Sequence, residues 1–148
     1  MFNKMGKRKF GILVIVLIIC GVFIAINGND PVERPISKKI ILDQKESVFD
    51  ESQFVFKPIF EQIGDVKKLK ILCEITSYMN PEILGLNYES QTMLELNEDL
   101  SLPSSWKVLE RSNYKIIGQL SFSVSSDVSI NPFTLRIFTY SDHEISWN

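Results

Sequence analysis

An uninterrupted apolar segment near the N-terminus constrains this chain more than any other feature. Residues 10–26 read FGILVIVLIICGVFIAI, and all 17 are apolar or glycine. At about 1.5 Å per residue, a helix of this length spans about 25 Å, which is the low end of what crosses a bilayer. Three lysines and an arginine precede the segment, and long basic side chains can reach the headgroups from a short span. The sequence therefore predicts a cytoplasmic basic tip over residues 1–9, a transmembrane signal anchor over residues 10–26, and a C-terminal part outside.

A cleaved secretory signal peptide is the alternative, because its basic and apolar regions look much the same. Two details favour the anchor. The apolar core is slightly long for a signal peptide, and Ala25-Ile26-Asn27 is a poor cleavage site that contains the only alanine of the chain. Cys20 does not point to a lipoprotein, since Leu17-Ile18-Ile19 precedes it and apolar sequence follows it. We therefore expect an uncleaved anchor in contact with the lipid bilayer.

The charge of the chain is divided unevenly about this segment. The 16 basic and 18 acidic residues give a net charge of −2. Residues 1–26 hold four basic and no acidic residues, so they carry +4, and the remainder holds 12 basic and 18 acidic residues, so it carries −6. An acidic outer part is repelled by nucleic acid and by anionic headgroups. We expect it to bind no nucleic acid and to stand off the membrane.

Cysteine and histidine are scarce, and this limits the chemistry of the chain. One histidine and two cysteines exclude an ordinary zinc site built from these ligands. Cys20 lies in the predicted span, so Cys73 is alone outside and no intrachain disulfide can form there. The low alanine content, with abundant Ile, Lys, Asn and Ser, is typical of a low-GC bacterial source. We expect a cell-membrane protein that faces the wall and needs no cofactor.

The outer part divides into a stalk and a domain rich in strands. Residues 27–37 (NGNDPVERPIS) contain two prolines and no periodicity, which predicts a short stalk. Residues 38–148 follow as one domain. Its clearest alternation of apolar and polar side chains runs from Leu69 to Ile75, which is typical of a strand with one wet face. Similar alternation over residues 120–125 and 133–140 predicts two further strands, the second of which forms a hairpin with the last strand.

Helical character is limited to Pro58–Val66, where a short helix or turn could pack its apolar side chains and end at Gly64. About seven or eight short antiparallel strands, separated by turns, predict a mainly β fold. We expect an immunoglobulin-like β-sandwich, with a small open barrel as the alternative. The segments Tyr114–Phe122 and Pro132–Ile137 resemble the final strands of immunoglobulin-like domains in anchored bacterial surface proteins. This resemblance implies the fold and no particular function.

A Ser-His-Asp catalytic site can be considered, because His143 is the sole histidine and Asp142 precedes it. Such a site needs a base that is held by a second group and aimed at a nucleophile. The sequence instead places His143 in a solvated hairpin turn near the end of the chain. No G-x-S-x-G nucleophile elbow occurs either. We predict a turn residue and no catalytic residue.

Two acidic groups, Asp43–Glu51 and Glu98-Asp99, are the candidates for the paired carboxylates of glycan cleavage. That reaction needs one carboxyl whose pKa is raised by an apolar pocket. Both groups lie in polar sequence, so we predict solvated loops. The spacing within Asp43–Glu51 does not match an EF-hand calcium loop either, and we expect no metal site.

The remaining candidates have structural interpretations. Cys73 shares the apolar face of its strand, where a free cysteine behaves as a small hydrophobic residue. The lysines at positions 67, 68 and 70 are typical of a solvated strand face or a protected sheet edge. Trp106 and Trp147 are the candidates for partner binding, although core packing is the default for such residues. Trp147 must either clamp the last strand or remain available to a partner, and we favour clamping.

These features favour a non-catalytic binding or assembly module, anchored by a single span and exposed outside the cell, with an unidentified protein partner. The alternative is a small protective or inhibitory protein of the immunity type. Such a protein would block a toxin or a wall hydrolase at the outer membrane face, and its acidic domain would attract a basic protein. An enzyme of the wall is disfavoured, because no acid/base or nucleophile arrangement is visible.

Overall fold

Strands make up nearly all of the regular structure in the computed structural model, which describes residues 37–125 and 132–148. Within these residues the chain forms ten strands and one short 3-10 helix, η1 (Pro81–Gly85). The strands are β1 (Ser37–Ile41), β2 (Lys45–Phe49), β3 (Ser52–Ile63), β4 (Val66–Ser77), β5 (Thr92–Leu96), β6 (Asp99–Ser101), β7 (Ser105–Arg111), β8 (Lys115–Val124), β9 (Phe133–Phe138) and β10 (Asp142–Trp147). The predicted basic tip, anchor and stalk lie outside the described residues, apart from Ser37 at the end of the stalk. None of the described helical structure is long and apolar enough to cross a membrane.

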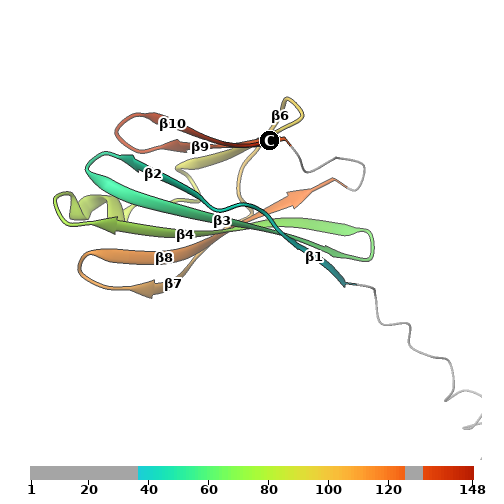
Figure 1. Ribbon diagram of the computed structural model, residues 1–148, viewed down its shortest axis with the longest axis horizontal. Coiled ribbons are helices and arrows are strands. Elements are labelled where there is room, and N and C mark those ends of the chain that lie inside the picture. Colours follow the sequence, from blue (N-terminus) through green and yellow to red (C-terminus); the bar gives the residue numbers. More distant parts are fainter. Residues whose placement is uncertain (1–36, 126–131) are drawn as a thin grey trace, which may run out of the picture. The chain divides into compact units, whose positions relative to one another are not determined.

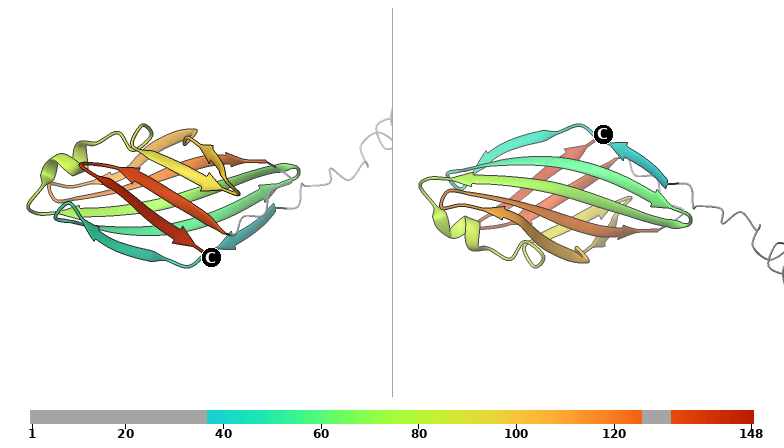
Figure 2. Two further views of the ribbon diagram at one scale, coloured as in Figure 1. Left: turned by 90° about the horizontal axis from the view of Figure 1, so that it is seen from above. Right: turned by 90° about the horizontal axis from the view of Figure 1, so that it is seen from below.

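The strands form two antiparallel sheets that pack face to face (Figure 1). The six-stranded sheet has the order β1-β3-β4-β8-β7, with β2 also paired to β3, and the four-stranded sheet has the order β10-β9-β5-β6. Figure 2 shows the strands of the smaller sheet crossing those of the larger one at an angle, as the twist of packed sheets requires. The predicted sandwich is therefore confirmed, and the alternative of an open barrel is wrong.

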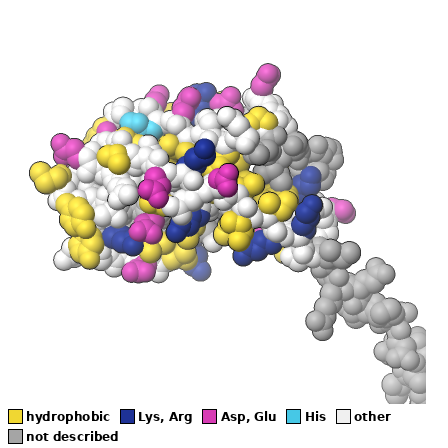
Figure 3. Space-filling model, viewed as in Figure 1, with side chains coloured by type: hydrophobic (Ala, Val, Ile, Leu, Met, Phe, Trp, Pro, Cys, Tyr) yellow, Lys and Arg dark blue, Asp and Glu magenta, His cyan; other side chains and the backbone are white. Residues whose placement is uncertain are grey.

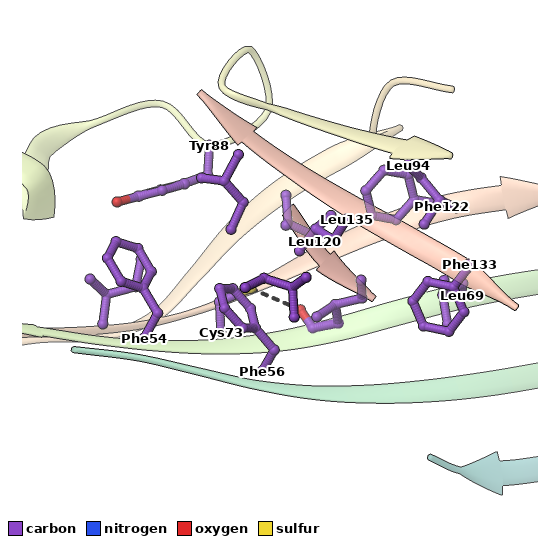
Figure 4. Packing of buried hydrophobic residues seen from close by; sticks show 14 of the residues in the cluster. Phe54, Phe56, Leu69, Cys73, Tyr88, Leu94, Leu120, Phe122, Phe133 and Leu135 are labelled. Carbon is purple, nitrogen blue, oxygen red and sulfur yellow. Dashed lines mark hydrogen bonds between the residues drawn. The ribbon is translucent and has the colours of Figure 1, made fainter. Parts of the chain in front are cut away.

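Alternation of side chains explains why these sequences form two facing sheets. Every second residue of β4 from Leu69 to Ser77 is buried, while the residues between them are partly exposed. The strands β8 and β9 follow the same pattern. The inward side chains of both sheets meet in one core, where Phe54 and Phe56 of β3 lie with Leu135 of β9 (Figure 4). Burial of each such large apolar side chain stabilises the fold by about 1.5–3 kcal/mol.

Pro58–Val66 does not form the predicted short helix. β3 continues through Pro58 to Ile63 and turns back into β4 at Gly64 and Asp65. Gly64 has a φ of +59° in this turn, a conformation that glycine adopts without steric cost. On one side of β3, β2 pairs as far as Phe56 and β1 pairs from Ile59 onward. Pro58 lies between these two pairings, where a residue without an N–H group is tolerated.

The structure has ten strands in its described part, not seven or eight, and β3 and β4 have 12 residues each. One of the additional strands is β2, which lies within the acidic run that the sequence assigns to a loop. A two-residue turn of Asp50 and Glu51 joins β2 to β3, with φ angles of 51° and 58°. Positive φ at both central residues matches the right-handed twist of a hairpin. Four of the five residues of β2 are at least partly exposed, and for this reason its sequence resembles that of a loop.

The strand register separates two ends of the domain. Ser37 pairs with Ile63, beside the turn between β3 and β4. β4 runs from this turn to Ser77, and at about 3.3 Å per residue it covers roughly 36 Å. We refer to the end with Ser37 as the proximal end and to the end with Ser77 as the distal end. In Figure 1, η1 and the β2–β3, β7–β8 and β9–β10 turns lie together at the distal end.

Candidate functional site

Four large apolar side chains are exposed at the distal end and lie close together. They are Tyr78, Met79, Tyr114 and Tyr140, with exposed fractions of 73%, 78%, 49% and 60%, and we refer to them as the distal apolar cluster. The rings of Tyr78 and Tyr114 stack with centroids 5.2 Å apart. The Tyr140 hydroxyl lies 3.4 Å from Asn80 Oδ1 and 3.3 Å from Glu82 Oε2. Figure 3 shows hydrophobic side chains gathered at this end.

Hydrogen bonds within and between two chain segments hold the Tyr78 and Tyr114 part of the cluster in place. The Ser77 hydroxyl donates to the Asn80 carbonyl at 2.7 Å, and the Asn80 N–H lies 3.1 Å from the Ser77 hydroxyl oxygen. The Ser77 N–H donates to the Tyr114 carbonyl at 2.9 Å, and the Arg111 guanidinium donates to the Leu84 carbonyl at 2.8 Å. These bonds join the segment that follows β4 to the β7–β8 turn, so the stacked tyrosines come from two connected loops.

Acidic side chains border the cluster. Glu82 lies within hydrogen-bonding reach of Tyr140, and Glu51 precedes Ser52, whose register partner is Ser77. Asp142 is exposed at the start of β10, two residues after Tyr140. An apolar surface with an acidic border is complementary to a protein surface that carries apolar and basic side chains.

The sequence position of His143 predicts a solvated turn, but His143 does not lie in one. It is the second residue of β10, where it pairs with Ile137, and its side chain is only 21% exposed. Its ring stacks on Phe49 with centroids 3.8 Å apart, and Phe49 in turn stacks on Phe54 at 3.9 Å. The prediction is wrong because the turn comes earlier, and because Phe49 belongs to the strand that the sequence assigns to a loop.

Asp50 links the two sheets beside His143. Its carboxylate accepts a hydrogen bond from the Thr139 hydroxyl, and its Oδ2 atom lies 3.4 Å from His143 Nε2. The bond from Thr139 holds the pKa of Asp50 below its ordinary value against the opposing effect of desolvation, and the bond to His143 acts in the same direction. Asp50 follows β2 and Thr139 follows β9, so this group ties the six-stranded sheet to the four-stranded sheet.

The side chains of Ser141, His143 and Asp50 lack the arrangement of a catalytic triad. The Ser141 hydroxyl oxygen lies 2.9 Å from His143 Nε2, and Asp50 approaches the same ring nitrogen. A triad needs the acid and the nucleophile on opposite nitrogens, so that the base can accept the proton of the nucleophile. The geometry fits a structural clasp between the sheets, and not activation of the serine.

Trp147, one of the two candidates for partner binding, is buried at the end of β10. Its ring stacks on Phe133 with centroids 4.7 Å apart, and its Nε1–H donates to the Asp43 carbonyl at 2.7 Å. Asp43 precedes β2, so this bond fastens the last strand to the other sheet. A terminal strand that is tied down in this way resists fraying.

Trp106, the other candidate, is half-buried on β7. Its ring covers Gly118, where a Cβ atom would lie 2.0 Å from Cη2 of the indole. It also packs against Tyr88 with ring centroids 5.1 Å apart. These contacts hold the edge strand β7 against the core. Partner binding through either tryptophan stays a prediction.

Cys73 is buried, as predicted, and desolvation raises the pKa of its thiol far above the ordinary value. A buried neutral thiol is chemically inert. The lysines of β4 lie on a central strand, so the sheet-edge interpretation is wrong. The solvated-face interpretation applies to Lys68 and Lys70, whereas Lys67 lies on the same face as Leu69 at the end of the strand. Over the described ranges, no group of His, Cys, Asp and Glu side chains is placed to hold a metal ion.

The distal apolar cluster is absent from the sequence-based candidates. Tyr78 and Met79 lie in a stretch that the sequence identifies only as a turn, and two large apolar residues within a turn were the available signal. Their proximity to Tyr114 and Tyr140 depends on loops that are far apart in the chain.

Comparison of the chain with protein family models, with curated proteins and with solved structures finds no match.

Proposed function

We propose that this protein is a non-catalytic binding or assembly module, anchored in the cell membrane by residues 10–26 and exposed outside the cell. Its distal apolar cluster contacts a protein partner that presents apolar and basic side chains. The observation that carries the proposal is the exposure of this cluster at the end of the domain farthest from Ser37. Exposed aromatic side chains in contact with one another are typical of interaction sites.

We infer further that the domain is immunoglobulin-like, and the strand order supports this. If β3 is taken as strand A, the order β3-β4-β8-β7 corresponds to A-B-E-D of an immunoglobulin-like sandwich. The order β10-β9-β5-β6 then corresponds to G-F-C-C′. β1 and β2 extend the first sheet beyond strand A. The domain departs from antibody domains because its one cysteine, Cys73, is free.

The proposed location rests on the sequence. The apolar segment is long enough to span, and the basic residues before it favour a cytoplasmic N-terminus. Ser37 enters the domain at the proximal end, so an anchor at residues 10–26 would leave the distal end free to meet a partner. This direction is what a membrane-tethered binding module needs.

Photo-crosslinking in intact native membranes tests the partner contact. A photoreactive phenylalanine analogue replaces Met79 in the full chain, and we expect irradiation to give an adduct of one defined mass. The Tyr78→Ser/Tyr114→Ser double substitution removes the stacked rings and should abolish the adduct. The matched control carries the analogue at Leu100, which is exposed on β6 outside the cluster. Equal adducts at both positions, or none at position 79, would contradict the proposal.

A protective or inhibitory protein is the second candidate, and the acidic border of the cluster favours it. Glu51, Glu82 and Asp142 would attract a basic toxin or wall hydrolase toward the apolar surface. A strain that lacks the protein should then be more sensitive to competitor supernatants, and Tyr78→Ser should reproduce this defect. A deletion strain as tolerant as its parent would contradict the protective role and leave the binding module intact.

A further inference from the structure

At the proximal end, the six-stranded sheet carries a charge opposite in sign to that of the whole domain. Five lysines lie on β1 and around the β3–β4 turn, and we refer to them as the proximal lysine group: Lys38, Lys39, Lys67, Lys68 and Lys70. Two acidic residues, Glu61 and Asp65, lie among them. In Figure 3, Lys and Arg side chains gather at this end between hydrophobic ones.

Three of these lysines, Lys39, Lys68 and Lys70, lie around one carboxylate. Lys39 on β1 and Lys68 on β4 are both register partners of Glu61 on β3. Lys70 Nζ lies 2.6 Å from Glu61 Oε2. The hydrogen bond from Lys70 holds the pKa of Glu61 below its ordinary value, and the charges of Lys39 and Lys68 act in the same direction. One carboxylate thus faces three ammonium groups, which leaves a local excess of positive charge.

Exposed apolar side chains lie at the tip of the same hairpin. Ile63 and Val66 flank the β3–β4 turn and are 50% and 56% exposed. They line a hollow of about 300 Å³ together with Glu61, Lys68 and Lys70. Apolar side chains flanked by lysines are the combination that lies at a membrane interface, with the apolar groups toward the acyl chains and the ammonium groups at the phosphates.

The chain length limits how far this end can lie from the anchor. Ten residues, 27–36, separate the apolar segment from Ser37. At no more than about 3.5 Å per residue, they reach at most about 35 Å. Ser37 pairs with Ile63, so the β3–β4 turn adjoins the point at which the domain is tethered.

We infer that the proximal lysine group, with Ile63 and Val66, rests on the anionic phospholipid headgroups of the outer leaflet and so directs the distal apolar cluster away from the bilayer. The inference rests on the proposed anchor.

The net charge of the outer part predicts repulsion from anionic headgroups. Screening by salt, however, limits the range over which each charge acts to about 8–10 Å at physiological ionic strength. The acidic residues of the distal end lie roughly 36 Å away along β4. Glu98 and Asp99, in the β5–β6 turn, are at the proximal end but belong to the facing sheet, about 10 Å away. Lys39 and Lys68 lie on the outer face of the six-stranded sheet, so the lysines determine the local interaction of that face.

Depth-dependent quenching in proteoliposomes tests this contact. The full chain, with Cys20→Ser and Asp65→Cys, carries an environment-sensitive dye at position 65, while the buried Cys73 stays unlabelled. It is reconstituted into phosphatidylcholine vesicles with or without phosphatidylglycerol, each with headgroup spin labels. We expect strong quenching only with phosphatidylglycerol, and its loss when salt rises from about 0.05 to 0.5 M, because the Debye length falls severalfold. A dye at Asn113, introduced by Asn113→Cys in the distal β7–β8 turn, should not be quenched under any of these conditions.

Charge-matched substitutions separate the lysine group from net charge. Each lysine near an anionic surface strengthens binding about fivefold, so Lys39→Gln/Lys68→Gln should reduce the contact equilibrium roughly 25-fold. The Lys45→Gln/Lys107→Gln control removes the same charge elsewhere and should leave quenching nearly unchanged. Circular dichroism confirms that both variants fold, and the salt dependence of the parent chain tests the contact without any lysine substitution.

The outcomes distinguish this inference from the proposed function. A chain that resists carbonate extraction but shows no quenching at position 65, or equal quenching in both lipids, overturns the lipid contact and leaves the anchor. A chain that carbonate extracts overturns the anchor and, with it, this inference. Equal loss of quenching in both double variants overturns the role of the lysine group. If the dye responds to soluble polyphosphate as strongly as to anionic vesicles, the lysine group binds polyanions in general, and the inference of a lipid site is overturned.

Discussion

Gly118 of β8 lies beneath the indole of Trp106, and no side chain fits between the two. A Cβ atom at this position would lie 2.0 Å from Cη2 of the ring, so the Gly118→Ala substitution must displace the indole from its contact with Tyr88. We expect the free energy of unfolding to fall by about 1–3 kcal/mol, as for other overpacked sites. Urea denaturation followed by circular dichroism measures the change.

Gly85→Ala is the matched control for this prediction. A Cβ atom at Gly85 would meet nothing within 4 Å, so we expect a change of less than about 0.5 kcal/mol. If the two glycine variants lose the same stability, steric exclusion by Trp106 is not the reason for Gly118.

Asp50 should make the domain sensitive to acid. Its pKa is lowered in the folded state, chiefly by the hydroxyl of Thr139, so its contribution to stability is present above about pH 4, the ordinary value for aspartate. This contribution is lost as the pH falls from there through the folded pKa. Asp50→Asn should therefore lower stability at neutral pH and flatten its decline below about pH 5.

Thermal unfolding at a series of pH values measures this effect. The control is Asp142→Asn, which removes an exposed carboxylate near the same turn. Part of the acid sensitivity should persist in the Asp50 variant, because the pKa of Glu61 is also lowered, by the hydrogen bond from Lys70. If the stability of Asp50→Asn declines with falling pH as steeply as that of the parent chain, the contact of Asp50 with Thr139 and His143 does not stabilise the domain.

The turn between β5 and β6 stores strain that glycine can release. Asn97 and Glu98 have φ angles of 51° and 69°, and a non-glycine residue in this region costs about 1–2 kcal/mol. Asn-Gly is the favoured pair for such a turn. We expect Glu98→Gly to stabilise the domain by about 1 kcal/mol. The larger conformational entropy that glycine gives the unfolded chain reduces this gain. Thermal unfolding provides the measurement, and a similar gain in Glu98→Ala would show that charge and not φ is responsible.

Strands with one wet face were predictable, and strands exposed on most of their length were not. The alternation in β4, β8 and β9 identifies each of them, because burial of every second side chain leaves a period of two. β2 buries only Phe49, so its sequence carries no such period. Pro58 suggested the start of a helix, whereas its place between two edge pairings is a property of the folded sheet. The distal apolar cluster escaped prediction for a related reason, since its tyrosines converge from three separate loops.

For the molecule as a whole, the proposed orientation predicts where proteases can act. Protease added to intact cells should remove residues 30–148, because the domain lies outside in this proposal. The intact mass of the protein from untreated cells should match the full 17.0 kDa chain, and not a product cleaved after the apolar segment. Immunoblotting of cells before and after lysis checks the topology. Digestion only after lysis would place the domain inside and refute the proposed location.

The pairing of β1 gives the domain a mechanical property. β1 joins β3 through five antiparallel register pairs that begin at Ser37, the residue nearest the tether. A partner that pulls on the distal end while the anchor holds Ser37 would load these strands along their own axes. The hydrogen bonds between β1 and β3 would then resist in shear, all at once, and would not open one after another like a zipper. With the proposed anchor and partner in place, the pairing of β1 with β3 would therefore carry the tension along the strands.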